Sequence, residues 1–104
     1  MEFDDSEPCY IISIAARMVG LHAQTLRYYE RAGLVEPSRS RGNRRLYSSE
    51  DVERLRRIRT LMNDLGVNLA GVEVIMRMAE RMAKMEREIQ ALELKVKRLG
   101  EAGL

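Results

Sequence analysis

The amino-acid sequence predicts a mainly α-helical protein: a winged helix-turn-helix head with a small β-hairpin wing, followed by a long C-terminal coiled-coil helix. Three observations lead to this fold class. Two short helical stretches are separated by Gly20, arginines surround a Gly42-Asn43 pair, and apolar residues repeat every three or four positions through the last third. We expect an acidic, flexible N-terminal segment at residues 1–9, a DNA-binding head at 10–78, and a dimerisation helix with a short tail at 79–104.

Charge is distributed unevenly along the 104 residues, whose net charge is only +2. Residues 1–9 carry four acids and no base, residues 10–59 carry eleven arginines against five acids, and residues 60–104 carry seven of each, so the segments contribute −4, +6 and 0. A basic head on a charge-balanced stalk is typical of a nucleic-acid-binding protein.

Several protein classes are excluded by composition. A single cysteine, Cys9, and a single histidine, His22, cannot form an internal disulfide or a zinc site, so we expect no cofactor and no metal. No apolar run approaches the roughly 18 residues that span a bilayer, and the first residues are acidic where a signal peptide is basic, so a cytoplasmic location is expected. An enzyme is not expected, because His22 with Glu30, Asp51 or Cys9 makes no recognisable triad or metal set.

Two short helices are expected at the start of the head. Ser13 is the expected N-cap of the first helix and Gly20 its end. The second helix is expected over Ala23–Arg31, with Gly33 as its C-cap. Apolar positions of the first helix follow helical spacing from residue 12: Ile14, Ala15, Met18 and Val19.

A hairpin and a third helix follow. An extended stretch at residues 34–37 leads into the hairpin, whose tip is the Gly42-Asn43 pair. Ser48 or Ser49 caps the third helix, which carries acids in its first turn where the helix dipole favours them, and Gly66 ends it. The expected buried stripe of this helix consists of Val52, Leu55, Ile58, Leu61, Met62 and Leu65.

A fourth helix is expected to begin at Leu69, after Asn68 as its cap, and to carry an unbroken heptad seam. The seam is too long to be buried against so small a head, so a second copy of the chain is the expected partner. β-branched residues at one set of seam positions favour a parallel pair only weakly, and the direction of the coil stays open. The seam consists of Ile75, Met78, Met82, Met85, Ile89, Leu92, Val96 and Leu99.

The second helix can present polar side chains to a major groove. Leu26 is expected to face the core, while Gln24, Thr25, Arg27 and Tyr28 project outward, where amide and guanidinium groups match base edges and phosphates. The competing interpretation is that Arg27 and Tyr28 are ordinary surface residues and Tyr29 is partly core. The arginines of the hairpin repel one another unless an anion relieves them, and they favour a wing: Arg39, Arg41, Arg44 and Arg45.

An ordered series of residues resembles the signature of the MerR family of transcription regulators. It comprises Thr25-Leu26-Arg27-Tyr28-Tyr29-Glu30, Gly33-Leu34-Val35, Pro37, Arg45, Tyr47, Asp51-Val52 and Arg54-Leu55. Two further stretches, residues 22–27 and 66–71, are most similar to the heat-shock repressor (HspR) branch. The resemblance implies a winged helix-turn-helix head and a C-terminal helix that joins two heads through an antiparallel coiled coil. The chain departs from the family at the hairpin tip, where Asn43-Arg44 replaces the usual glycine and aromatic residue.

The resemblance also implies which residues contact double-stranded DNA. Thr25, Arg27 and Tyr28 would lie at the groove, Tyr29 would reach a phosphate or brace the head, and Arg45 would clamp the DNA backbone with Tyr47 seating it. The full set expected at the DNA consists of Arg17, His22, Gln24, Thr25, Arg27, Tyr28, Tyr29, Arg41, Arg44, Arg45 and Tyr47.

The function implied by the resemblance is repression of heat-shock and chaperone genes by a homodimer that binds an inverted repeat. An Hsp70-type chaperone is the implied co-regulator, and the location is cytoplasmic, at the nucleoid. Two alternatives stay open: a MerR-type activator that responds to another signal, and a protein-protein adaptor that uses the coiled coil and a basic head.

Overall fold

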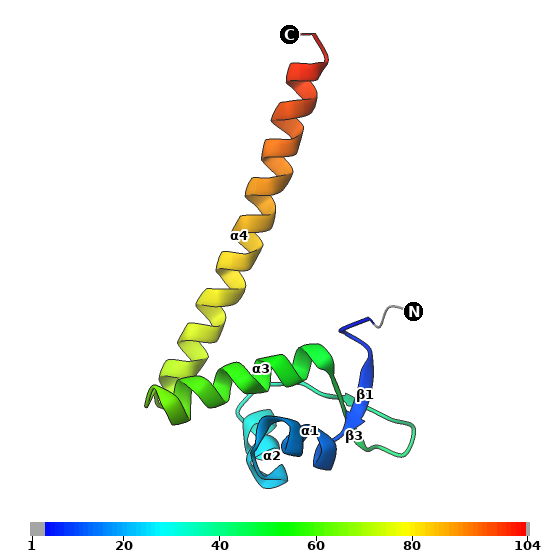
Figure 1. Ribbon diagram of the computed structural model, residues 1–104, viewed down its shortest axis with the longest axis vertical. Helices are drawn as coiled ribbons and strands as arrows, with labels where there is room; N and C mark the ends of the chain where they lie inside the picture. Colours follow the sequence, from blue (N-terminus) through cyan, green and yellow to red (C-terminus); the bar gives the residue numbers. More distant parts are fainter. Residues whose placement is uncertain (1–3, 104) are drawn as a thin grey trace. The chain divides into compact units, whose positions relative to one another are not determined.

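The computed structural model describes residues 4–103, which form two compact units that meet between Asn68 and Leu69. Unit 1 contains three strands and three short helical segments, and unit 2 is a single long helix, α4 (Figure 1). The expected boundary after residue 78 therefore falls inside α4 (Leu69–Glu101), because this helix continues past that position without a break. Each unit is described by itself below.

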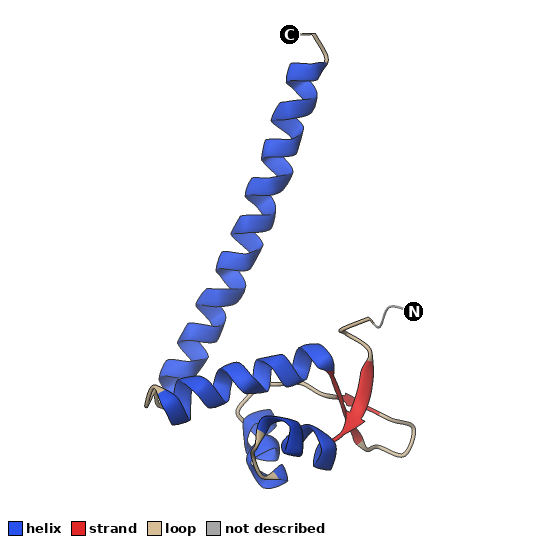
Figure 2. Cartoon of the chain, viewed as in Figure 1, coloured by secondary structure: helices blue, strands red, loops and turns tan. Residues whose placement is uncertain are grey.

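A small antiparallel sheet in the order β1-β3-β2 forms one part of unit 1 (Figure 2). Strand β3 (Arg45–Ser48) is central and pairs with β2 (Ser38–Arg39) and with β1 (Pro8–Ile11). The β2–β3 pair is the predicted hairpin.

Strand β1 corrects the expectation of a flexible segment over residues 1–9, as far as these residues are described. Tyr10 lies opposite Tyr47, and Pro8 lies opposite Ser48 across a register shift. Before the strand, the carbonyl oxygen of Asp5 accepts a hydrogen bond of 2.9 Å from the backbone nitrogen of Glu50. The segment is thus held by backbone hydrogen bonds, which composition does not reveal; residues 1–3 lie outside the described part.

Helix α1 (Ile12–Val19) begins directly after β1 and is followed by α2 (Ala23–Arg31). The expected N-cap, Ser13, instead lies inside the first turn of α1; the N-cap is Ile11, which makes no side-chain capping bond. Gly20 ends α1 as predicted, with a left-handed φ of 69°, and its backbone nitrogen bonds to the carbonyl oxygens of Ala16 and Arg17. A side chain at Gly20 would also lie against Arg59, whose Nη1 is 3.5 Å from the position of a Cβ atom.

Helix α3 (Ser49–Arg59) opens with a capping box in which the Ser48 hydroxyl accepts from the Asp51 nitrogen and the Asp51 carboxylate accepts from the Ser48 nitrogen. A π-helical turn, η1 (Thr60–Asp64), follows. The turn corrects the predicted stripe, because its wider winding breaks the 3.6-residue periodicity: Leu65 is 67 % exposed, and Leu61 and Met62 are only partly buried. Val52, Leu55 and Ile58 are buried as expected.

The core of unit 1 draws on α1, α2, α3, β3 and the segment after α2. Its buried apolar residues are Ala15, Ala16, Val19, Leu26, Tyr29, Leu34, Val35, Tyr47, Val52, Leu55 and Ile58. Two of the apolar residues expected to follow the buried side of α1 remain outside this core, since Ile14 and Met18 are about two-fifths exposed.

Unit 2 begins at Leu69 as predicted and continues as one uninterrupted helix to Glu101. All eight seam residues of α4 are exposed, from 37 % at Ile75 to 68 % at Met82. Such a row of exposed apolar side chains is unusual for the surface of a soluble monomer.

Candidate nucleic-acid interface

Helices α1 and α2 form the predicted helix-turn-helix, joined by a tight turn at Gly20. The turn is closed by a hydrogen bond of 3.0 Å from the Leu21 nitrogen to the Ala16 carbonyl oxygen. Ala15 is fully buried and Ala16 is nearly so, because small side chains allow neighbouring elements to approach α1 closely.

Helix α2 has one buried and one solvent-facing side. Leu26 is completely buried, whereas Gln24 and Tyr28 are exposed and Thr25 and Arg27 are half-buried. Nη1 of Arg27 donates to Oε1 of Gln24 at 3.0 Å, so the amide and the guanidinium group are presented together. The predicted outward face of α2 is therefore available for contact with a polar partner.

The two remaining polar residues at the edge of the helix-turn-helix, Arg17 and His22, are both exposed. His22 is the N-cap of α2, but its side chain makes no capping hydrogen bond. A capping role for this imidazole is thus not seen, and its ring is accessible.

Two aromatic residues from the predicted DNA-binding set are buried instead. Tyr29 is 3 % exposed, and its burial, together with the neighbouring Tyr28 hydroxyl, raises the pKa of its own hydroxyl. Tyr47 is completely buried and its hydroxyl has no hydrogen-bond partner; burial, aided by the nearby Glu30 carboxylate, raises its pKa to about 12. Tyr47 is accordingly a core residue of the wing rather than a group that touches DNA, and Tyr29 fits the bracing role.

The wing consists of β2, β3 and the turn between them. Asn43 takes a left-handed φ of 61°, and its backbone nitrogen donates to the Ser40 carbonyl oxygen at 2.9 Å. The Ser40 hydroxyl accepts from the Arg44 nitrogen at 3.2 Å. This turn leaves Arg41 and Arg44 exposed.

Glu30, near the end of α2, binds both strands of the wing. One carboxylate oxygen accepts from Nη2 of Arg39 at 2.9 Å, and the other accepts from Nε of Arg45. The anion that relieves two of the four wing arginines is therefore internal, which weakens the inference from their mutual repulsion. Sequence reasoning did not assign a role to Glu30, because a pair across fifteen residues leaves no periodic signal.

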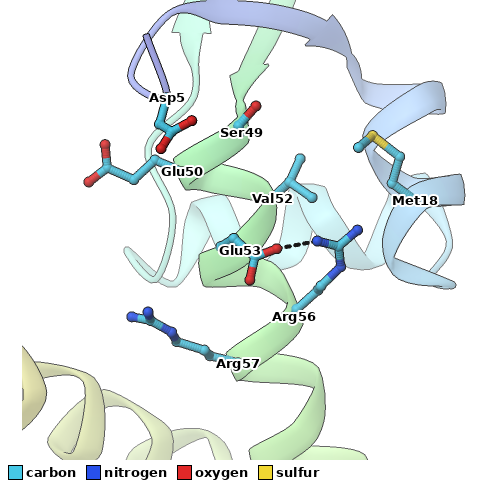
Figure 3. A pocket seen from close by; sticks show the side chains of 8 residues that line it. All are labelled: Asp5, Met18, Ser49, Glu50, Val52, Glu53, Arg56 and Arg57. Atoms are coloured by element: carbon cyan, nitrogen blue, oxygen red, sulfur yellow. Dashed lines mark hydrogen bonds and ion pairs between the residues drawn. The ribbon is translucent and has the colours of Figure 1, made fainter. Parts of the chain in front are cut away.

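A second surface of unit 1 carries a mixed-charge pocket with a volume of about 590 Å³ (Figure 3). Figure 3 shows Met18 of α1 on one side and the first turns of α3 on the other, with an ion pair between Glu53 and Arg56. None of the predicted DNA-contact residues lines this pocket, whose walls are Asp5, Met18, Ser49, Glu50, Val52, Glu53, Arg56 and Arg57.

Other kinds of site were searched for over residues 4–103. Within that range no three His, Cys, Asp or Glu side chains come together in a way that could hold a metal ion. None of the described helices combines the length and apolar character needed to cross a membrane.

Residues 10–79 match the family described as MerR HTH family regulatory protein. The chain belongs to the MerR family. This MerR-family chain is 45 % identical to the heat shock protein HspR of Streptomyces coelicolor over 85 residues, 82 % of the chain and 56 % of the relative. It is 43 % identical to the regulator GlnR of Bacillus anthracis over 72 % of the chain and 57 % of the relative. The chain thus spans a little over half the length of these relatives.

Solved structures of MerR-family regulators share the fold. HiNmlR, described as a family member lacking the sensor domain and bound to promoter DNA, superimposes with a TM-score of 0.63 at 23 % identity, covering 88 % of this chain and 76 % of the other. A regulator from Bacillus cereus gives 0.61 at 23 % identity, covering 89 % and 73 %. The mainly helical fold with its small sheet is thereby confirmed as that of a MerR-type head.

Proposed function

We propose that this MerR-family chain is a sequence-specific DNA-binding transcription regulator that binds an inverted repeat as a homodimer. The observation that carries the proposal is the joint presentation of the polar face of α2 and the arginine-bearing wing, which Glu30 ties together. A recognition helix reads base edges in the major groove while neighbouring basic side chains fix its position on the phosphates. The solved relative bound to promoter DNA supports the same use of the fold.

The groups on this surface divide into two roles. Gln24, Thr25 and Arg27 carry hydrogen-bonding groups on the exposed side of α2 and are assigned to base recognition, with Tyr28 beside them. Positively charged groups around them are assigned to the phosphates, where charge matters more than sequence: Arg17, His22 at the start of α2, Arg41, Arg44 and the part-exposed Arg45.

Helix α4 is assigned to dimerisation. Its seam combines a regular heptad spacing with exposure, and pairing with another copy would bury eight large apolar side chains. Two identical heads joined in this way read a symmetric operator, and their half-sites are spaced by about one helical turn or a multiple of it.

The biological role proposed is repression of heat-shock and chaperone genes in the cytoplasm, at the nucleoid, with an Hsp70-type chaperone as co-regulator. The support is the 45 % identity to a protein named HspR across most of this chain. Thermal release of the operator, reversed by adding the chaperone, is the observation that would single out this role among MerR-type regulators.

The experiment that tests DNA recognition is selection of bound sites from random duplex, followed by footprinting of the selected sites. Arg45→Ala is expected to weaken binding to every duplex by a similar factor, whereas Thr25→Ala and Arg27→Ala also change the preferred bases. Arg87→Ala, an exposed arginine on α4, is the matched control and is expected to leave both properties unchanged. Binding that is indifferent to sequence, or an equal loss from all three head variants, contradicts the assignment.

A further inference from the structure

The charges that flank the seam of α4 specify how two copies pair. This inference rests on the proposed dimer and adds its direction and register. With Ile75, Met82, Ile89 and Val96 as a positions, the d positions are Met78, Met85, Leu92 and Leu99. The g positions are then Val74, Arg81, Glu88 and Lys95, and the e positions are Ala79, Glu86, Glu93 and Gly100. These two rows flank the seam and meet their counterparts on the second copy.

A parallel pair would bring each g residue to the e residue five positions later on the second copy. Arg81 would meet Glu86, which is favourable, but Glu88 would meet Glu93, which is not. By symmetry each contact occurs twice, so attraction and repulsion offset each other. The parallel arrangement therefore gains nothing from its flanking charges.

An antiparallel pair places a residues against d residues, and g residues against g residues. With Met82 against Met85 at the centre, Ile75 packs on Leu92 and Met78 on Ile89, and the flanking rows pair Arg81 with Glu88 twice. Val74, which is 53 % exposed, comes opposite Lys95, whose aliphatic stem can cover it. The e row pairs Ala79 with Glu86, so no like charges meet.

Shifting this antiparallel pair by one heptad in either direction creates like-charge contacts. In one direction Arg81 meets Lys95 and Glu88 meets its own copy; in the other, Arg81 meets its own copy and fewer apolar layers overlap. We propose that the dimer is an antiparallel coil centred on Met82 and Met85, held in register by two Arg81–Glu88 ion pairs.

Cysteine cross-linking reads the register directly. In the full chain with Cys9→Ser, a mixture of the Ile75→Cys and Leu92→Cys chains is expected to form a disulfide-linked dimer under mild oxidation. Ile75→Cys alone is expected to form little, because its two copies would lie about 25 Å apart along the coil. Linkage of Ile75→Cys to itself would establish a parallel pair. Preferential linkage to Met85→Cys or Leu99→Cys would establish a shifted register, and either result overturns the proposal.

Charge reversal at Glu88 gives an independent reading, because the two directions predict opposite signs. Glu88→Arg places two arginine pairs across the antiparallel coil and is expected to weaken dimerisation about tenfold, whereas in a parallel coil it would meet Glu93 and strengthen it. The double variant Arg81→Glu with Glu88→Arg restores the wild-type dissociation constant. Arg87→Glu, on the outer face, is the matched control. Sedimentation equilibrium separates the outcomes: a stable dimer with the wrong response refutes only the register, whereas a wild-type chain that is monomeric at micromolar concentration refutes the proposed dimer itself.

Discussion

Unit 1 and α4 contain similar kinds of apolar side chains but bury them in different ways. In unit 1, Leu26 and Leu55 are completely inaccessible, and they are enclosed by residues of the same chain. Along α4, Met82 and Leu92 are 68 % and 61 % exposed. Since burial of apolar area is the main favourable term in folding, the head has its stabilising surface within one chain, whereas the distal helix needs a second surface to cover it.

The largest expected effect comes from disrupting the seam. Ile89→Asp introduces two charges into the apolar interface of the dimer, and we expect a monomer at micromolar concentration with operator affinity reduced at least about 100-fold, because two linked half-sites are lost. Sedimentation equilibrium and gel-shift titration measure the two effects. Leu94→Asp is the matched control on the same helix, since Leu94 is 49 % exposed but lies off the seam. Equal behaviour of both variants would remove the distinction between the two units.

A cavity in the head tests the other half of the comparison. Leu55→Ala removes a fully buried side chain from α3 and is expected to lower the free energy of unfolding by roughly 2–5 kcal/mol. Leu65→Ala removes the same atoms from a side chain that is 67 % exposed, and a change within about 0.5 kcal/mol is expected. Urea denaturation at fixed protein concentration compares them. If the two costs are equal, the core does not lie where the structure places it.

A smaller effect is expected at the link between α2 and the wing. Glu30→Gln removes the negative charge shared by Arg39 and Arg45, and we expect stability to fall by about 1 kcal/mol, since these pairs are only partly shielded from water. Raising the salt concentration should narrow the difference from wild type. Glu36→Gln serves as the control because Glu36 is exposed. A loss that does not depend on salt would point to packing rather than charge.

The smallest effect is expected from the buried hydroxyl of Tyr47. Because the folded chain holds the pKa of Tyr47 at about 12 and the unfolded chain ionises near the ordinary value of 10, stability is retained below pH 10 and falls as the pH rises through 12. Tyr47→Phe removes this part of the alkaline loss. At neutral pH it changes stability by no more than about 1 kcal/mol, since the hydroxyl makes no hydrogen bond. Urea titrations at pH 8 and pH 11 compare the variant with Tyr28→Phe, an exposed control. A pH dependence identical to that of wild type would rule out Tyr47 as the titrating group.

Local signals predicted most of the secondary structure. Gly20, Ser48 and the Gly42-Asn43 pair each mark a boundary through a cap or turn geometry that depends on neighbouring residues, and the structure has each boundary at that place. Heptad spacing likewise predicted α4 from Leu69 onwards. Such features can be inferred from sequence because their physical cause lies within a few residues.

Features that depend on distant partners could not be inferred in the same way. Strand β1 contains four residues and exists through its pairing with β3. The π turn after Arg59 shifts the face of the helix by an amount that no periodic analysis foresees. At the candidate site, the outward residues of α2 were assigned correctly as accessible, but the burial of Tyr47 and the bridge through Glu30 depend on how the wing packs.

The most direct test of the central claim counts the chains that assemble on one duplex. Analytical ultracentrifugation of the full chain, free and with a duplex carrying an inverted repeat from the site selection, measures both stoichiometries at moderate salt. We predict a dimer in the absence of DNA and two chains on each duplex, with a scrambled duplex bound at least about 1,000-fold more weakly. A free monomer at micromolar concentration that binds both duplexes equally would contradict the account.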